Sequence, residues 1–170
     1  MSNIIHSTDG TTIEITQNGK NVKFENIDTH CKIIFNTSSP FEYNIYEFNC
    51  GTRGGGNGAK LLYDALKYIK QNTDRRKLPF RISLKAVPES EDATKNDIRN
   101  LIKYYTSLGF QMDNSLASYG EVDNMFGMFD TVLTETERKV MGSSGGKRSK
   151  RKRTLKRKKI KGKNKTHRRR

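Results

Sequence analysis

The chain has no tryptophan, three prolines and two cysteines among its 170 residues. It also lacks any apolar run that approaches the roughly 20 residues of a membrane-spanning helix. Its N-terminus has none of the charged start, long apolar run and small-residue exit that define a signal peptide. Together these absences predict a soluble, intracellular protein without a membrane span.

The scarcity of cysteine limits the covalent and metal chemistry that we expect. Cys31 and Cys50 can form at most one disulfide. Their spacing from each other and from His6, His30 and His167 matches no metal-binding pattern. We therefore expect two reduced thiols and no metal site.

Acidic residues are absent from residues 147–170, which hold sixteen Lys or Arg side chains. The whole chain has 33 basic and 18 acidic residues, so residues 1–146 carry 17 basic and 18 acidic side chains and are nearly neutral. The net charge of +15 therefore belongs to the tail. This division predicts one globular domain over residues 1–142, followed by a Gly/Ser linker and a disordered polybasic tail over residues 143–170.

The tail has only Leu155 and Ile160 as large apolar residues, which is too few to build a core. A polycation of this kind binds nucleic acid without sequence preference, and its basic clusters also fit the pattern that nuclear import receptors read. The tail is similar to C-terminal tails on proteins of large DNA viruses, which adds a virion or host-cell location to the nuclear one. The clusters are Lys150, Arg151, Lys152, Arg153, Lys156, Arg157, Lys158 and Lys159.

The first part of the domain reads as β structure. Short apolar runs between turn residues fill residues 12–48 and predict an antiparallel sheet with at least three strands. Asn18 and Gly19 are typical of a two-residue hairpin turn. Residues 61–69 then change to helical spacing and predict an amphipathic helix that ends near residues 72–74.

Later residues predict alternating strands and helices. A strand is expected around Phe80–Leu84, and Thr94 with Asp97 predicts a capped helix that ends at Gly109. Residues 110–112 should begin another strand, residues 125–133 a last strand, and residues 135–141 a short helical turn. The order predicts a mixed α+β domain with a glycine-rich loop at the centre of its sheet.

That loop, residues 49–60, joins a predicted strand to a predicted helix. Backbone N–H groups of such a loop can surround an anion at the start of a helix. A Walker A loop is excluded because Asn57, rather than Lys, follows Gly56. A dinucleotide-binding fingerprint fits formally from Gly54 to Ala59, but the next strand ends in Lys85 instead of the required acidic residue.

Two motifs in this chain resemble those of the GNAT N-acetyltransferase superfamily. Residues 53–59 read Arg-x-x-Gly-x-Gly-Ala, which is similar to the family's pyrophosphate-binding signature. The later helix ends in Tyr105-x-x-x-Gly109-Phe110, similar to the family's second motif, and a strand lies between the two. The resemblance covers residues 40–133 and extends loosely over the first 40. It implies a GNAT-like, mostly antiparallel sheet flanked by helices, and transfer of an acetyl group from acetyl-CoA to a primary amine.

The resemblance also implies roles for single residues. Tyr105 matches the tyrosine that protonates the departing thiolate, although a packed core tyrosine is the simpler interpretation. Glu47 and Glu42 are candidates for the base, although a surface carboxylate is the simpler interpretation. Strands on either side of the loop and its helix should splay apart to admit the pantetheine arm. Expected cofactor contacts are Phe48, Arg53, Gly54, Gly55, Gly56, Asn57, Gly58, Ala59 and Lys60.

The chain departs from the family in three places. Ile98 and Leu101 stand where many members have Asn and Ala. Residues 1–52 offer no counterpart of the paired helices that build much of the family's acceptor site. The acceptor groove should therefore be open or completed by a partner. Two alternatives follow, a non-catalytic GNAT-like protein that binds nucleic acid through its tail, and a dinucleotide-binding oxidoreductase.

Overall fold

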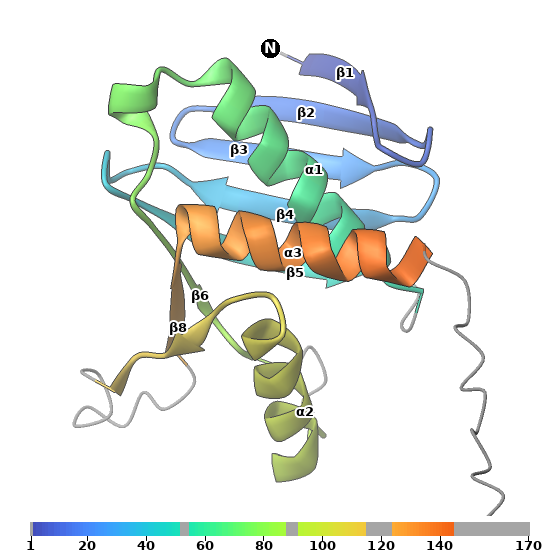
Figure 1. The fold of residues 1–170 in the computed structure, drawn as a ribbon, viewed down its shortest axis with the longest axis vertical. Coiled ribbons are helices and arrows are strands. Elements are labelled where there is room, and N and C mark those ends of the chain that lie inside the picture. Colours follow the sequence, from blue (N-terminus) through green and yellow to red (C-terminus); the bar gives the residue numbers. More distant parts are fainter. Residues whose placement is uncertain (1, 52–54, 88–91, 115–123, 145–170) are drawn as a thin grey trace, which may run out of the picture.

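The computed structural model describes residues 2–51, 55–87, 92–114 and 124–144 (Figure 1). In these residues five strands precede the first helix, and three strands and two further α-helices follow it. The strands are β1 (Ser2–His6), β2 (Thr12–Asn18), β3 (Asn21–Asn26), β4 (Cys31–Asn36), β5 (Glu42–Cys50), β6 (Arg81–Lys85), β7 (Gln111–Met112) and β8 (Asn124–Met128). The helices are α1 (Asn57–Asn72), the 3-10 turn η1 (Arg75–Lys77), α2 (Lys95–Thr106) and α3 (Phe129–Ser144).

All eight strands form one sheet in the order β1-β2-β3-β4-β5-β6-β8-β7. Every neighbouring pair is antiparallel except β5 and β6, which run parallel. A parallel pair needs a crossover connection, and α1 supplies it. The predicted mixed α+β domain with a mostly antiparallel sheet is confirmed, and the glycine-rich loop follows β5 near the middle of the sheet.

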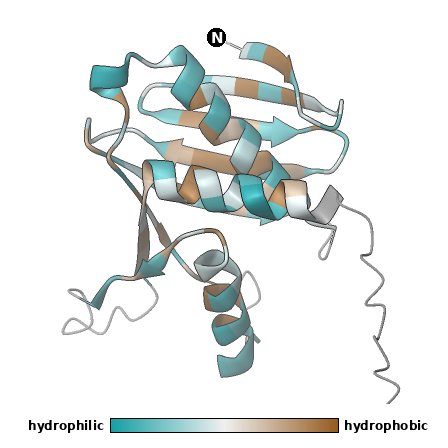
Figure 2. Ribbon diagram, viewed as in Figure 1, coloured by the Kyte–Doolittle hydropathy of each residue, from teal (hydrophilic) through white to brown (hydrophobic). Residues whose placement is uncertain are grey.

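The core lies between one face of the sheet and the helices α1 and α3, which lie side by side over that face (Figure 1). Strand register places Ile15, Phe24 and Ile33 in one row across β2, β3 and β4. Leu62 and Leu66 of α1 are fully buried against this face, and burying such a side chain contributes about 1.5–3 kcal/mol. The solvent side of α1 is mostly hydrophilic (Figure 2), as expected for a helix with one apolar face.

The other face of β2 to β5 carries charged side chains, because alternate residues of a strand point to opposite faces. Two ion pairs lie there: Lys23 with Glu25 at 2.7 Å, and Lys32 with Glu47 at 2.6 Å. Residues 2–51 contain strands and turns but no helix, as predicted. The paired helices that the resemblance associates with an acceptor site are therefore missing from this part of the chain.

Two features of the first hairpins were not predicted correctly. Asn18 pairs with Asn21, so the two-residue loop is Gly19–Lys20, one position later than expected. Gly19 has a φ of 58°, which glycine adopts without a steric penalty. Strand β1 was not predicted, because it is an edge strand whose burial is slight and whose sequence shows little alternation.

The C-terminal element is a long helix rather than a strand followed by a turn. β8 ends at Met128, and α3 begins at Phe129 and continues to Ser144, so the predicted strand over residues 125–133 is wrong in its second half. Val132, Thr136 and Val140 are buried at spacings of four residues, which is a helical period. Val132 of this face lies against Gly109 and Gly127, and α3 also packs beside α1, so tertiary contacts override the strand-like composition.

The prediction of two reduced thiols is wrong, because Cys31 and Cys50 form a disulfide. Both residues lie at strand ends that pair directly, and their Cα atoms are 4.0 Å apart. Their separation in sequence gives no sign of this, since it depends on the register between β4 and β5. The disulfide fixes the end of β5 immediately before the glycine-rich loop.

None of the helices that the structure describes is both long and apolar enough to cross a membrane.

Candidate anion-binding site at the start of helix α1

The first turn of α1 is built to receive an anion. Gly56 precedes it with a left-handed φ of 72°, and no side chain caps the helix. The N–H groups of the first three helical residues, Asn57, Gly58 and Ala59, have no carbonyl partner within a helix. The first turn contains no acidic residue, so the positive end of the helix dipole is not neutralised there. Arg53 and Gly54 of the predicted signature lie outside the described residues.

Lys60 takes no direct part in this open turn. Its N–H donates to the carbonyl of Gly56 at 3.1 Å, within the helix. Its ammonium lies 3.0 Å from the carboxylate of Asp9, on the loop between β1 and β2. Hydrogen bonds hold the pKa of Asp9 well below its usual range. The bond from Ser7 has the largest effect, and bonds from Thr11 and Lys60 add to it. The open N–H groups of this turn are therefore those of the three residues before Lys60, and the predicted cofactor contacts stay predictions.

Gly58 lies against two aromatic side chains, and this contact explains the need for glycine. A Cβ added to Gly58 would be 3.0 Å from the hydroxyl oxygen of Tyr104 and 3.2 Å from the ring of Phe48. The approach brings α2, which lies later in the sequence, against β5 and the start of α1. A glycine here leaves the backbone N–H groups accessible beside an aromatic wall.

The two adjacent tyrosines of α2 have different surroundings. Tyr105 is 6% exposed, and its ring centroid lies 6.0 Å from those of Phe48 and Phe110. Burial raises the pKa of Tyr104 to about 12, and the ammonium of Lys139 lies 4.6 Å from its ring centroid. Motif spacing identified Tyr105 alone. Motif spacing did not predict that Tyr104 lies close to Gly58. The only indication of this contact in the sequence is that two tyrosines are adjacent.

Pairing between the parallel strands β5 and β6 ends well before β5 does. The register ends at Ile45 and Leu84, one residue before the end of β6, whereas β5 continues to Cys50. At the same point a bulge in β5 leaves Tyr46 unmatched opposite β4, and its side chain is 77% exposed. Bulges occur often beside functional sites, where they redirect side chains. The predicted splay of the two strands stays a prediction.

The candidate base and the candidate acid lie on opposite sides of β5. Phe48 faces Tyr105, and Glu47, one residue before it, points to the other face of the sheet. The carboxylate of Glu47 is paired with Lys32, and Glu42 lies 3.6 Å from Arg81.

Two other predictions concern sites elsewhere. Among the residues that the structure describes, no group of three His, Cys, Asp or Glu side chains is placed to hold a metal ion. The basic clusters at residues 150–153 and 156–159 lie outside the described ranges, so their roles in nucleic-acid binding or nuclear import stay predictions.

Comparison with known proteins gives little further information. No protein-family model and no curated protein matches the chain. Among solved structures, the chain is similar to the crystal structure of the anti-CRISPR protein AcrVA5, with 21% identity and a TM-score of 0.45. The match covers 62% of this chain and 96% of the other. The assignment of a function therefore rests on the geometry of the site.

Proposed function

We propose that this protein is an N-acetyltransferase that transfers an acetyl group from acetyl-CoA to a primary amine. The observation that carries the proposal is the uncapped N-terminus of α1, which follows β5. A helix start of this kind binds phosphate groups. The first GNAT-like motif ends in this turn, at residues 57–59, and Tyr105 of the second motif packs against Phe48 of β5.

The residues at the helix start fit a diphosphate group. The N–H groups of Asn57, Gly58 and Ala59 supply donors, and the helix dipole supplies positive potential without a metal ion. Gly58 has no side chain to block approach, and Phe48 and Tyr104 border it. When bound, acetyl-CoA supplies an activated thioester as the acyl donor.

Proton transfer is assigned to one side chain of β5 and one of α2. The acceptor nitrogen attacks the acyl carbon, the bond from carbon to sulfur breaks, and the nitrogen loses one proton. In this proposal Glu47 accepts that proton, and the Tyr105 hydroxyl donates a proton to the sulfur. Acid and base then act from opposite sides of β5.

Two observations favour a second function. Glu47 is already paired with Lys32, and residues 2–51 contribute no helices to an acceptor site. A non-catalytic GNAT-like domain that binds nucleic acid through its tail would show both features. Release of free CoA from acetyl-CoA, measured with polyamine, lysine-peptide and N-terminal-peptide acceptors, separates the two. Acceptor-dependent release supports the enzyme, and its absence with every acceptor favours the second function.

Tyr105→Phe should lower kcat about 100-fold while leaving the Kd for acetyl-CoA nearly unchanged, because only the acid is removed. Steady-state kinetics and calorimetry measure the two effects. Tyr63→Phe, another buried tyrosine whose hydroxyl bonds Glu137, serves as the matched control. If Tyr104→Phe slows turnover and Tyr105→Phe does not, the acid is Tyr104 and the motif-based assignment is wrong.

Glu47→Gln should also lower kcat about 100-fold, because the amine then loses its proton without a base. The remaining rate should rise with pH as the free amine becomes more abundant. Glu25→Gln is the control, since Glu25 lies on the same face and is paired with Lys23 in a similar way. Equal rates for both variants and the wild type would remove Glu47 from the mechanism.

A further inference from the structure

Strand β1 forms one edge of the eight-stranded sheet, and none of the described strands pairs with its outer side (Figure 1). The strand has five residues, a usual length for a β-strand. All of them except Ile5 are exposed. The strand at the opposite edge, β7, has only two residues. The β1 edge is therefore the longer of the two templates to which a further strand can be added.

The backbone groups that point outward from β1 follow from the bonds on its inner side. Ile27, immediately after β3, donates its N–H to the carbonyl of Thr12 in β2 at 3.0 Å. Both backbone groups of a strand residue point to the same side, so those of Thr12 point to β3 and away from β1. His6 pairs with Thr12 and therefore directs its own N–H and carbonyl to the open edge. Because the direction alternates along a strand, Ile4 and Ser2 do the same.

The sequence of β1 contains none of the devices that keep edge strands apart. Natural edges carry lysine or other charged residues, a proline or a bulge. Residues 2–6 read Ser-Asn-Ile-Ile-His, without Lys, Arg, Asp, Glu or Pro. Their register with β2 runs without interruption. At the centre of the strand Ile4 is 67% exposed, so this edge is suited to pairing.

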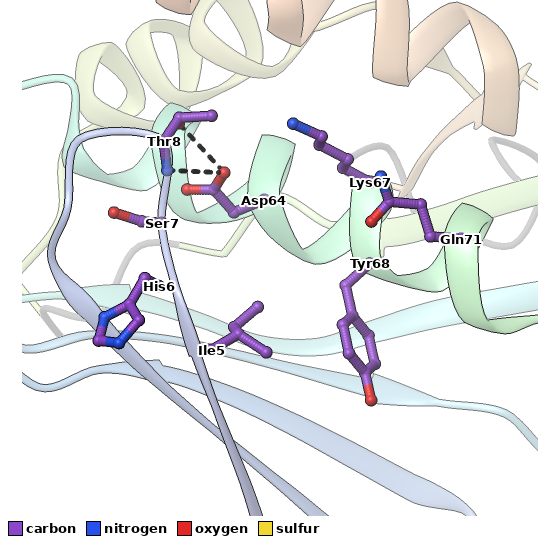
Figure 3. A pocket seen from close by; sticks show the side chains of 8 residues that line it. All are labelled: Ile5, His6, Ser7, Thr8, Asp64, Lys67, Tyr68 and Gln71. Atoms are coloured by element: carbon purple, nitrogen blue, oxygen red, sulfur yellow. Dashed lines mark hydrogen bonds between the residues drawn. The ribbon is translucent and has the colours of Figure 1, made fainter.

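The hairpin of β1 and β2 is also fixed on the body of the protein. The hydroxyl of Thr8, in the turn after β1, donates to the carboxylate of Asp64 in α1 at 3.1 Å (Figure 3). In the same turn, Asp9 pairs with Lys60 of α1 at 3.0 Å. A cavity lies between Ile5 and α1, so the helix stands away from the strand (Figure 3). An edge that is held in place loses little conformational entropy when it pairs, which favours association.

We propose that β1 pairs antiparallel with β1 of a second copy of this chain, so that the two sheets join across a two-fold axis. With Ile4 opposite Ile4 of the copy, the outward backbone groups of Ser2 meet those of His6 at either end. The strand thus complements itself, as a two-fold interface requires. An apolar pair lies at its centre, and β1 brings no like charges of acidic or basic residues to face each other. This interface does not depend on the proposed acetyltransferase activity.

Sedimentation equilibrium of the full chain tests the proposal. The average mass should rise from that of one chain towards that of two as the concentration increases, because a five-residue strand pair is a small interface that forms a weak dimer. Ile4→Lys should raise the Kd of dimerisation at least about tenfold, since two lysines would then lie opposite each other. Ile27→Lys is the matched control, because Ile27 is another exposed isoleucine and lies in the turn after β3. Its Kd should equal that of the wild type.

Amide hydrogen exchange shows whether β1 is the surface that pairs. Dimer formation should slow exchange at Ile4 and His6, whose N–H groups point outward. Exchange at Asn3 and Ile5 should change little with concentration, because the N–H groups of these residues already bond to β2.

Three results would overturn the proposal. They are the mass of a single chain at every concentration, an equal Kd for Ile4→Lys and the wild type, and a dimer in which exchange at Ile4 and His6 is unchanged. If Ile4→Lys does not fold, Ile4→Pro decides, because an edge strand tolerates proline where the N–H faces outward. That variant lacks the outward N–H at the centre of the interface and should also raise the Kd at least about tenfold.

Discussion

Gly127→Ala is expected to lower the free energy of unfolding by about 2–3 kcal/mol, through overpacking alone. A Cβ on Gly127 would lie 2.4 Å from Cγ2 of Val132 and 2.8 Å from the carbonyl oxygen of Gly109. Neither neighbour can withdraw easily, since Val132 is fully buried in α3 and the Gly109 carbonyl belongs to the turn after α2. The strain would separate β8 from the elements that position Tyr104 and Tyr105.

Urea denaturation of the wild type and the variant measures this change. Gly142→Ala is the matched control, because a Cβ on Gly142 meets nothing within 4 Å. Alanine exceeds glycine in helix propensity by about 1 kcal/mol, so this control should be neutral or slightly stabilised. A Gly127→Ala protein with wild-type stability would contradict the close approach of α2, β8 and α3.

Gly58→Val is expected to weaken acetyl-CoA binding at least about 100-fold, or about 2.7 kcal/mol. A Cβ at this position already meets Phe48 and Tyr104, at 3.2 and 3.0 Å. The branched side chain therefore has no room on that side and must extend over the N–H groups of the first turn. Backbone approach to a phosphate at a helix start depends on this space.

Calorimetry on the full-length proteins measures the loss of affinity for acetyl-CoA. The polybasic tail is identical in all variants, so any binding of phosphate by the tail cancels in the comparison. Gly142→Val provides the same substitution at a helical glycine whose added Cβ meets nothing within 4 Å. Its acetyl-CoA affinity should equal that of the wild type. Wild-type affinity in a folded Gly58→Val protein would show that the cofactor binds elsewhere.

Local signals in the sequence predicted the elements around the site. The loop glycines, the helical spacing after them and the Thr94–Asp97 pair depend on neighbouring residues only. The structure confirms α1 and α2, and Thr94 and Asp97 form a reciprocal capping box. Gly109 follows α2 with a φ of 91°, as a left-handed cap requires.

Features set by distant residues could not be predicted in the same way. The Cys31–Cys50 disulfide depends on the register between two strands, and the contact of Tyr104 with Gly58 depends on how α2 packs against α1. Residues 129–133 are apolar enough for a strand, but burial of Val132 against Gly109 and Gly127 favours the helix. The composition of this segment allows a strand and a helix equally, and tertiary packing decides between them.

The central claim is that the open N–H groups at the start of α1 bind the diphosphate of acetyl-CoA. Titration of the isotope-labelled full chain with acetyl-CoA, followed by amide nuclear magnetic resonance, tests it directly. The account predicts saturable shifts in the amides of Asn57, Gly58 and Ala59, with the Gly58→Val variant losing them. Shifts confined to the basic tail, residues 147–170, or no saturable shift at residues 57–59, would contradict it.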